Sequence, residues 1–354
     1  MSSRFRWWVA VLASLIACAC GPNVEPPTTP RANVAAQAPA APSSVPTERD
    51  PVRLAFVTNN PSIFWRHSEA GLRAYEVEAH VQVDMKMPQN GTIEDQNRIL
   101  QDLGRKGYDA VAVSVISPID QLQVLDRLAE QTNLITFDSD AEQSKRLLHI
   151  GTDNFEAGKA LGDRINQLLP HGGKIAVFVG NFSSANAAQR LAGIVAATRD
   201  HGIQIVDKRE DNTDRATALA NVKDVIATHK ELNLLVGLWN YNGPAIAAGL
   251  ESSGKHGKIL AVVFDEDVKT LAAIERGTIQ ATVAQKPFEF GYVSGKWLHL
   301  LATGGERAKQ SIPAGAKIDT GVEVVDASNV AAFESRMQQA LEKLEQSGRA
   351  IGAE

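Results

Sequence analysis

Seven residues, ILAVVFD at positions 259–265, decide the fold class of this chain. Six apolar residues follow one another without a polar interruption, and the run then ends at Asp265. A strand with one solvated face alternates polar and apolar side chains, whereas an unbroken apolar run is typical of a strand that helices cover on both faces. We therefore expect a buried strand of a parallel sheet, with an acidic side chain at its carboxyl end.

The same pattern recurs along the chain from residue 52. Between the apolar runs lie stretches with helical spacing of Leu, Ile and Val, such as residues 93–107 and 216–230. This alternation predicts parallel α/β sheets, and the grouping of the runs favours two lobes over one large sheet. A last strand and a terminal helix are expected after residue 321. The other runs are LAFVT (54–58), VQVDMKM (81–87), AVAVSV (110–115), LITFD (134–138), LLHIGT (147–152), KIAVFVG (174–180), IQIVDK (203–208), LNLLVGLW (232–239) and QATVAQ (280–285).

The N-terminus has the features of a signal peptide at residues 1–17. Arg4 and Arg6 precede an uncharged, mostly apolar stretch that is too short to span a bilayer as a helix. The stretch ends in Leu-Ile-Ala-Cys, which resembles a bacterial lipobox, so we expect lipidation of Cys18. Lipid chains there would anchor the protein to a membrane in the periplasm or cell envelope. Lipidation of Cys20 and a plain signal peptide are the alternatives.

A flexible tether is predicted behind the anchor, at residues 18–51. Eight of the chain's 15 prolines lie in this segment, and Ala, Ser and Thr fill most of the rest. Such a composition buries too little apolar surface to offset the entropy of ordering the chain. The segment should therefore be extended and hold the folded part away from the membrane.

Composition excludes several classes of function. The net charge of −5 argues against a nucleic-acid partner. Both cysteines precede residue 21, so the rest of the chain has no disulfide framework and no cysteine metal site. The eight histidines are scattered without metal-ligand spacing, and no nucleotide-binding or nucleophile motif is present. We expect no metal, no cofactor and no enzymatic activity.

Planar polar side chains and aromatic rings follow most of the predicted strands. Ligands bind at the carboxyl ends of the strands in open α/β sheets. Amide, guanidinium and carboxylate groups make the paired hydrogen bonds that vicinal hydroxyls need, and aromatic rings cover apolar ring faces. The set therefore suits an uncharged polyol such as a sugar. The candidates are Asn60, Phe64, Trp65, Asp138, Arg190, Asn240, Asp265 and Gln285.

Two other interpretations of these residues stay open. Asn and Asp after strands are often turn or N-cap residues, and that role is expected for Asn59, Asp140, Asp153, Asn154 and Asp267. Asp138 and Asp265 are also a candidate carboxylate pair for glycoside hydrolysis, which requires a defined separation between the two groups.

Seven short motifs resemble those of the periplasmic sugar-binding proteins of ABC transporters, of the ribose and galactose type. They occur in the same order and at similar spacing, and the resemblance covers roughly residues 53–325. The motifs are NNP (59–61) with the aromatics after it, Phe137-Asp138, IGTDN (150–154), AQRLAG (188–193), Asn240, VFD (263–265) and ATVAQ (281–285).

The resemblance implies the type I periplasmic binding protein fold, with two Rossmann-like lobes of parallel sheet joined by a three-strand hinge. The N-terminal lobe would comprise residues 52–152 and 286–313. The C-terminal lobe would comprise residues 153–285 and 314–326. Residues 327–354 would form a C-terminal helical extension.

The resemblance also implies a role for each candidate residue. Phe64 and Trp65 would supply a stacking wall, with Trp239 or Phe264 from the other lobe. Ser62-Ile63 is an insertion before the first two rings, and it leaves open which of them stacks. Hydrogen bonds to the sugar would come from Asn60, Asp138, Arg190, Asn240, Asp265 and Gln285.

The function implied is that of a substrate-binding lipoprotein. It would capture a monosaccharide or polyol between the lobes, close by a hinge motion, and dock as a monomer on ABC permease subunits. Ser139 stands where many members carry Arg, so the sugar itself is not implied. A sensor subunit that presents the ligand to a membrane receptor is the alternative, because its binding site would look the same.

Overall fold

The structure is a computed structural model that describes residues 51–62 and 64–346. The predicted signal peptide, Cys18 and the tether up to residue 50 lie outside the described residues, as do residues 347–354. Among the described helices, none is long and apolar enough to cross a membrane.

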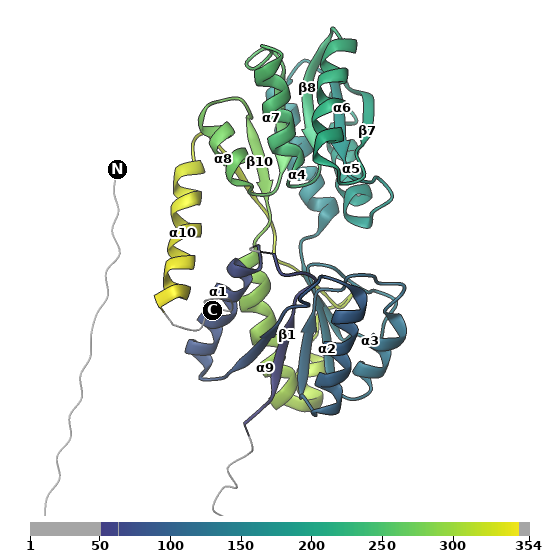
Figure 1. The fold of residues 1–354 in the computed structure, drawn as a ribbon, viewed down its shortest axis with the longest axis vertical. Helices are drawn as coiled ribbons and strands as arrows, with labels where there is room; N and C mark the ends of the chain where they lie inside the picture. The colour runs from purple at the N-terminus through teal and green to yellow at the C-terminus, as the bar shows by residue number, and fades with distance from the viewer. Residues whose placement is uncertain (1–50, 63, 347–354) are drawn as a thin grey trace, which may run out of the picture. The chain divides into compact units, whose positions relative to one another are not determined.

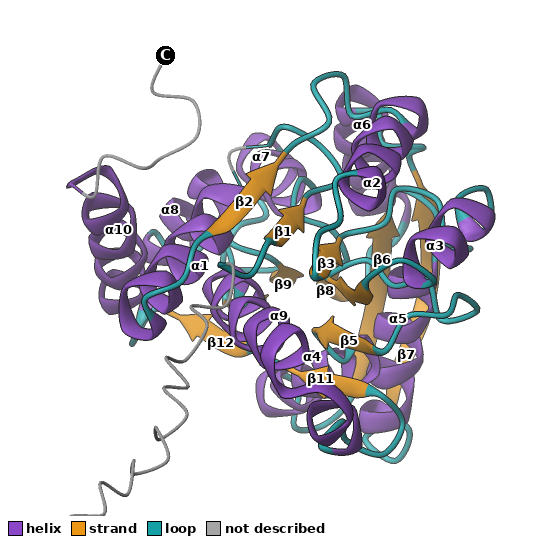
Figure 2. Cartoon of the chain, turned by 90° about the horizontal axis from the view of Figure 1, so that it is seen from below, coloured by secondary structure: helices purple, strands orange, loops and turns teal. Residues whose placement is uncertain are grey.

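The first sheet, which contains the strand labelled β1 in Figure 1, has six parallel strands in the order β11-β5-β4-β3-β1-β2. Helices cover both of its faces, as Figure 2 shows. Leu54 and Phe56 face a core shared with α1 and α9, whereas Ala55 and Val57 face a core shared with α2 and α3. The elements are β1 (Leu54–Val57), α1 (Trp65–Ala79), β2 (Val83–Lys86), α2 (Ile93–Arg105), β3 (Ala110–Val113), α3 (Leu122–Ala129), β4 (Asn133–Phe137), β5 (Leu148–Gly151), α9 (Pro287–Gln310) and β11 (Lys317–Asp319).

The second sheet also has six strands, in the order β12-β10-β9-β8-β6-β7. All of its pairs are parallel except β10 with β12. The elements are α4 (Asn154–Leu168), β6 (Gly173–Val179), α5 (Ala185–Thr198), β7 (Ile203–Glu210), α6 (Arg215–Thr228), β8 (Leu232–Gly237), α7 (Asn242–Ser252), β9 (Leu260–Phe264), α8 (Val268–Glu275), β10 (Ala281–Ala284), β12 (Glu323–Asp326) and α10 (Val330–Gln346).

The run at 259–265 forms β9, which lies inside the second sheet and is covered on both faces as predicted. Val262 and Phe264 pack with α4 and α5, while Ala261 and Val263 pack with α6, α7 and α8. All four side chains are fully buried. The other nine predicted runs also form strands, and the predicted C-terminal strand and helix are β12 and α10.

The chain passes three times between elements of the two sheets. The crossings follow β5, β10 and β11. One boundary differs from the sequence expectation. Residues 314–326 were assigned to the C-terminal lobe, but β11 pairs with β5 in the first sheet, so the third crossing begins after Asp319. The sequence did not show β11 because the strand has only three residues, and both Lys317 and Asp319 are exposed.

Two glycines let α1 and α9 pack with their backbones in contact. A Cβ atom on Gly71 would lie 1.9 Å from the Phe288 carbonyl oxygen, and one on Gly291 would lie 1.7 Å from the Ser68 carbonyl oxygen. Backbone atoms cannot move aside as a flexible side chain can. This contact therefore fixes α1, whose N-terminus directly follows the loop after β1.

Replacement of Gly291 by Ala should separate the two helices and lower the free energy of unfolding by about 2 kcal/mol or more. Urea denaturation of the two proteins measures this difference. Gly295→Ala in the same helix is the matched control, because its Cβ would meet side chains rather than backbone, Tyr75 at 3.0 Å and Leu72 at 3.2 Å. Equal losses in the two variants would show that the Gly291 contact does not limit the packing.

Candidate functional site

Two aspartates occupy equivalent positions at the carboxyl ends of the two sheets. Asp138 follows β4 with φ of 54°, and Asp265 follows β9 with φ of 69°. Each donates its backbone N–H to the next strand, Asp138 to the Ile150 oxygen at 3.0 Å and Asp265 to the Val283 oxygen at 2.9 Å. Left-handed backbone is costly for a residue other than glycine and is often found at functional sites. The two sheets thus present the same strained acidic turn.

Arg190 is the central cation of the second half of the site. The residue is only 2% exposed and lies in α5. Its Nε donates to Asn154 Oδ1 at 2.9 Å, and its Nη1 donates to the Leu238 carbonyl oxygen at 2.7 Å. The same Nη1 lies 3.6 Å from Asp265 Oδ2. The guanidinium carbon sits 4.3 Å above the centre of the Phe264 ring. Arg190 is therefore held on several sides and fixes Asp265 in turn.

Gln285 and Asn240 complete the polar set from the second sheet. Gln285 Nε2 donates to Asp265 Oδ1 at 3.0 Å, so both oxygens of that carboxylate face a donor. Asn240 lies in the turn after β8 and is partly exposed. Within the described chain its side chain makes no hydrogen bond. Its amide is thus available to a ligand, whereas the amide of Asn242 is buried and bonded to Trp239 N and Asp211.

The loop after β1 places its two aromatic rings differently. Trp65 is 2% exposed and packs edge-on against Phe137 in the core of the first sheet. Phe64 is partly exposed and packs edge-on against Trp65, with ring centroids 5.0 Å apart. The structure therefore puts Trp65 in the core rather than in the predicted stacking wall. Phe64 is the ring of this pair that a ligand can reach.

Asn60 connects this loop to the core. Its Oδ1 accepts hydrogen bonds from Ser62 N at 2.9 Å and from the Trp65 indole at 3.2 Å. Its Nδ2 donates to Asn59 Oδ1 at 2.7 Å. These bonds order the loop, and they leave the partly exposed Asn60 with fewer free hydrogen-bonding groups for a ligand than the sequence suggested.

Most of the residues that were expected to be turn or N-cap residues have a structural role. Asp153 and Asp267 accept backbone N–H groups as N-caps of α4 and α8. Asn154, by contrast, contacts Arg190 and belongs to the site as a supporting residue.

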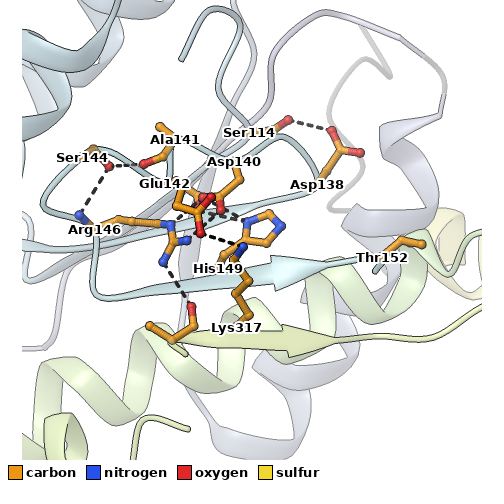
Figure 3. Close-up of polar contacts among 12 residues, drawn as sticks. Ser114, Asp138, Asp140, Ala141, Glu142, Ser144, Arg146, His149, Thr152 and Lys317 are labelled. Atoms are coloured by element: carbon orange, nitrogen blue, oxygen red, sulfur yellow. Dashed lines mark hydrogen bonds and ion pairs between the residues drawn. The ribbon is translucent and has the colours of Figure 1, made fainter. Parts of the chain in front are cut away.

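Asp140 faces away from the site and organises the connection between β4 and β5 (Figure 3). It accepts from Arg146 Nη2 at 2.7 Å and lies 3.5 Å from His149 Nδ1. Arg146 also donates to the Ala316 carbonyl oxygen just before β11. Burial lowers the pKa of His149 to about 4, so this imidazole stays neutral near pH 7.

The site carries an excess of negative charge. Burial raises the pKa of Asp138 to about 6; the hydrogen bond from Ser114 Oγ, at 2.8 Å, opposes this rise, and the charge of Asp265 adds to it. Burial and the charge of Asp265 raise the pKa of Glu266 to about 8. Arg190 is the cation that lowers both pKa values. The charge of one guanidinium thus acts on Asp138 and Glu266, and the same group lies beside Asp265.

Glu266 also follows β9, but the family resemblance does not include it among the ligand-binding residues. Its Oε2 is buried and has no hydrogen-bond partner among the described residues. The only signal in the sequence was its place in the acidic triplet Asp265-Glu266-Asp267, and nothing there separates a buried acid from a solvated one. No group of three or more His, Cys, Asp or Glu side chains in the described ranges is arranged to hold a metal ion.

Comparison with known proteins identifies the family to which this chain belongs. A family model described as the periplasmic binding protein domain matches residues 54–307, well over half of the chain. The chain belongs to this family of periplasmic binding proteins. The predicted resemblance and the predicted fold, two mostly parallel α/β sheets joined by three crossings, are confirmed.

Individual relatives of this periplasmic binding protein are about one quarter identical to it over the aligned residues. The D-allose-binding periplasmic protein of Escherichia coli is 25% identical over 266 residues, 72% of this chain and 84% of that protein. A ribose import binding protein of Bacillus subtilis is 26% identical over 231 residues, 64% of this chain and 73% of that protein. An ABC transporter solute-binding protein from Burkholderia graminis, solved in complex with D-arabinose, is 27% identical with a TM-score of 0.70, covering 79% of this chain and 97% of that one.

The raised pKa values predict that two conservative substitutions stabilise the protein relative to the wild type. For each variant this gain in the free energy of unfolding grows with pH over a different range and stays constant above it. An acid whose pKa is higher when folded destabilises the folded state as pH rises from the unfolded to the folded value. Asp138→Asn should therefore gain stability between about pH 4 and pH 6, by at most about 3 kcal/mol. Glu266→Gln should continue to gain up to about pH 8. Urea denaturation from pH 4.5 to pH 9 checks both. A gain in stability that did not depend on pH would contradict the raised pKa values of Asp138 and Glu266.

Proposed function

We propose that this periplasmic binding protein captures a monosaccharide or a related polyol at the carboxyl ends of its two sheets. The observation that carries the proposal is the pair Asp138 and Asp265, each on a strained strand end, with the charge of Asp265 raising the pKa of Asp138. Carboxylates of this kind accept hydrogen bonds from hydroxyl groups, and a polyol supplies such donors without adding another negative charge.

The neighbouring residues support a polyol rather than an anion. Arg190 is already bonded to Asn154, the Leu238 carbonyl oxygen and Asp265, so its capacity to neutralise an anionic ligand is largely used. Gln285 and Asn240 add neutral amides. The aromatic faces would come from Phe64 in the first lobe and from Trp239 in the second. Trp239 is partly exposed, and its indole N–H donates to Asn186 at 3.3 Å. Phe264 is fully buried beneath Arg190 and supports the site from below.

Delivery of the ligand to an ABC permease is part of the proposal. It is supported by relatives that are named as a ribose import binding protein and as an ABC transporter solute-binding protein. Lipidation of Cys18 would keep the monomeric protein in the periplasm or cell envelope beside the permease, with residues 18–51 as the tether. Closure of the two lobes on the ligand would be a hinge motion at the three crossings. We infer binding without turnover, because the relatives are binding proteins.

Binding of a sugar should raise the melting temperature, because the ligand stabilises the folded state by RT ln(1 + [L]/Kd). A thermal-shift panel of pentoses, hexoses, polyols and amino sugars measures this. D-allose, D-ribose and D-arabinose are the first sugars to test, since the names of the relatives contain them. Absence of a shift with every carbohydrate in the panel would overturn the proposed function.

Asn240→Ala should then weaken binding of a confirmed sugar by about tenfold, the equivalent of one neutral hydrogen bond. Because the Asn240 side chain makes no hydrogen bond to the residues that the structure describes, the melting temperature of the unliganded protein should not change. Gln101→Ala, at an exposed position of α2, is the matched amide control and should alter neither quantity. Unchanged affinity in Asn240→Ala would remove this residue from the site.

A further inference from the structure

The C-terminal helix α10 begins in the core of the second lobe. Val330 and Phe333 are 4% and 7% exposed and pack in one cluster with Val325 of β12 and with Leu271 and Ile274 of α8. Met337, one turn further along, is a partly buried neighbour of the same cluster. The first half of α10 is therefore fixed to the second lobe by apolar packing.

The far end of α10 contacts the first lobe instead. Its last turns lie against α1, as Figures 1 and 2 both show. Leu344 is only 2% exposed, and Glu345 Oε1 lies 2.9 Å from Arg66 Nη2 in the first turn of α1. The ion pair is partly solvated and contributes little by itself. The Leu344 side chain is buried in the same last turn of α10, and its burial stabilises this arrangement more, by about 2 kcal/mol.

Arg66 lies directly after the loop that carries the first-lobe ligand groups. Asn60, Phe64 and Trp65 precede it, and the Trp65 indole donates to Asn60. The opposite face of α1 is fixed by the backbone contact with α9 described above. The helix that leaves the ligand loop is therefore held from two sides, by α9 within its own lobe and by α10 from the other lobe.

We propose that α10 is a strap between the lobes, with Leu344 as a positioning residue that holds α1 and the adjoining ligand loop. A helix of 17 residues is a rigid rod of about 25 Å, long enough to reach from the core of the second lobe to α1. Besides the three crossings, α10 makes a fourth connection between the lobes. It orders the Asn60–Phe64 loop before ligand arrives, and this order lowers the entropy lost on binding.

This role differs from that of a cap on the second lobe. A cap would protect the amides of β12 and α8, where α10 starts, from hydrogen exchange. It would leave exchange in α1 unaffected. A strap protects α1 and the ligand loop, which lie far from its start in the sequence and in the other lobe. The part of the proposal that concerns affinity rests on the proposed function, whereas the part that concerns the ordering of α1 does not.

Hydrogen exchange of the full-length protein distinguishes the two roles. Leu344→Ala should raise amide exchange in residues 59–70 by tenfold or more, with little change in β12 and α8. Glu342→Ala, exposed in the same turn of α10, is the matched control and should leave exchange unchanged. Leu344→Met should keep the wild-type protection from exchange, since Met fills about the same apolar volume as Leu. Unchanged exchange in residues 59–70, or a change confined to β12 and α8, would overturn the strap.

Ligand affinity of the same variants tests the second part. With a sugar that shifts the melting temperature of the wild type, Leu344→Ala should raise the Kd at least threefold, and Leu344→Met should bring it back. A lower Kd in Leu344→Ala would mean that α10 opposes lobe closure and would overturn its positioning role. If no sugar binds even the wild type, the proposed function fails, whereas the exchange result still decides whether α10 orders α1.

Discussion

The buried guanidinium of Arg190 is the constraint around which the second half of the site is built. A charge removed from water is tolerated only when hydrogen bonds and counter-charges surround it. Asn154, the Leu238 carbonyl oxygen and Asp265 provide these, and the Phe264 ring closes the remaining face. These partners come from the start of α4 and from the ends of β8 and β9. Arg190 therefore ties together strand ends that would otherwise vary independently.

The same arrangement leaves the carboxyl groups of the site in excess over their one cation. Arg190 lies beside Asp265 and acts by its charge on Asp138 and Glu266, whose pKa values are raised by burial and by the charge of Asp265. Left-handed backbone at both Asp138 and Asp265 adds strain. Stability is given up at this place, and ligand hydroxyls that donate to the carboxylates would recover part of it. The rest of the lobes compensates with tightly packed, fully buried strands.

The sequence predicted what depends on local pattern and missed what depends on packing partners. An unbroken apolar run such as 259–265 has few alternatives, so the strands and both lobes were found. The three residues of β11 carry one partly buried side chain and gave no signal. The sequence pattern cannot separate the two roles of Trp65, because an aromatic ring near a strand end looks the same whether it faces Phe137 or a sugar. The burial of Glu266 Oε2 and the contact of α10 with α1 depend on distant segments, which one sequence does not reveal.

A crystal structure of the complex with the sugar that gives the largest thermal shift tests the central claim most directly. The account predicts one sugar molecule whose hydroxyl oxygens lie within hydrogen-bond distance of both Asp138 and Asp265, with Arg190 still bonded to Asn154 and Leu238. It also predicts the Phe64 ring, and not that of Trp65, against the sugar. A sugar that contacts only one of the two aspartates, or that lies away from both sheet ends, would contradict it.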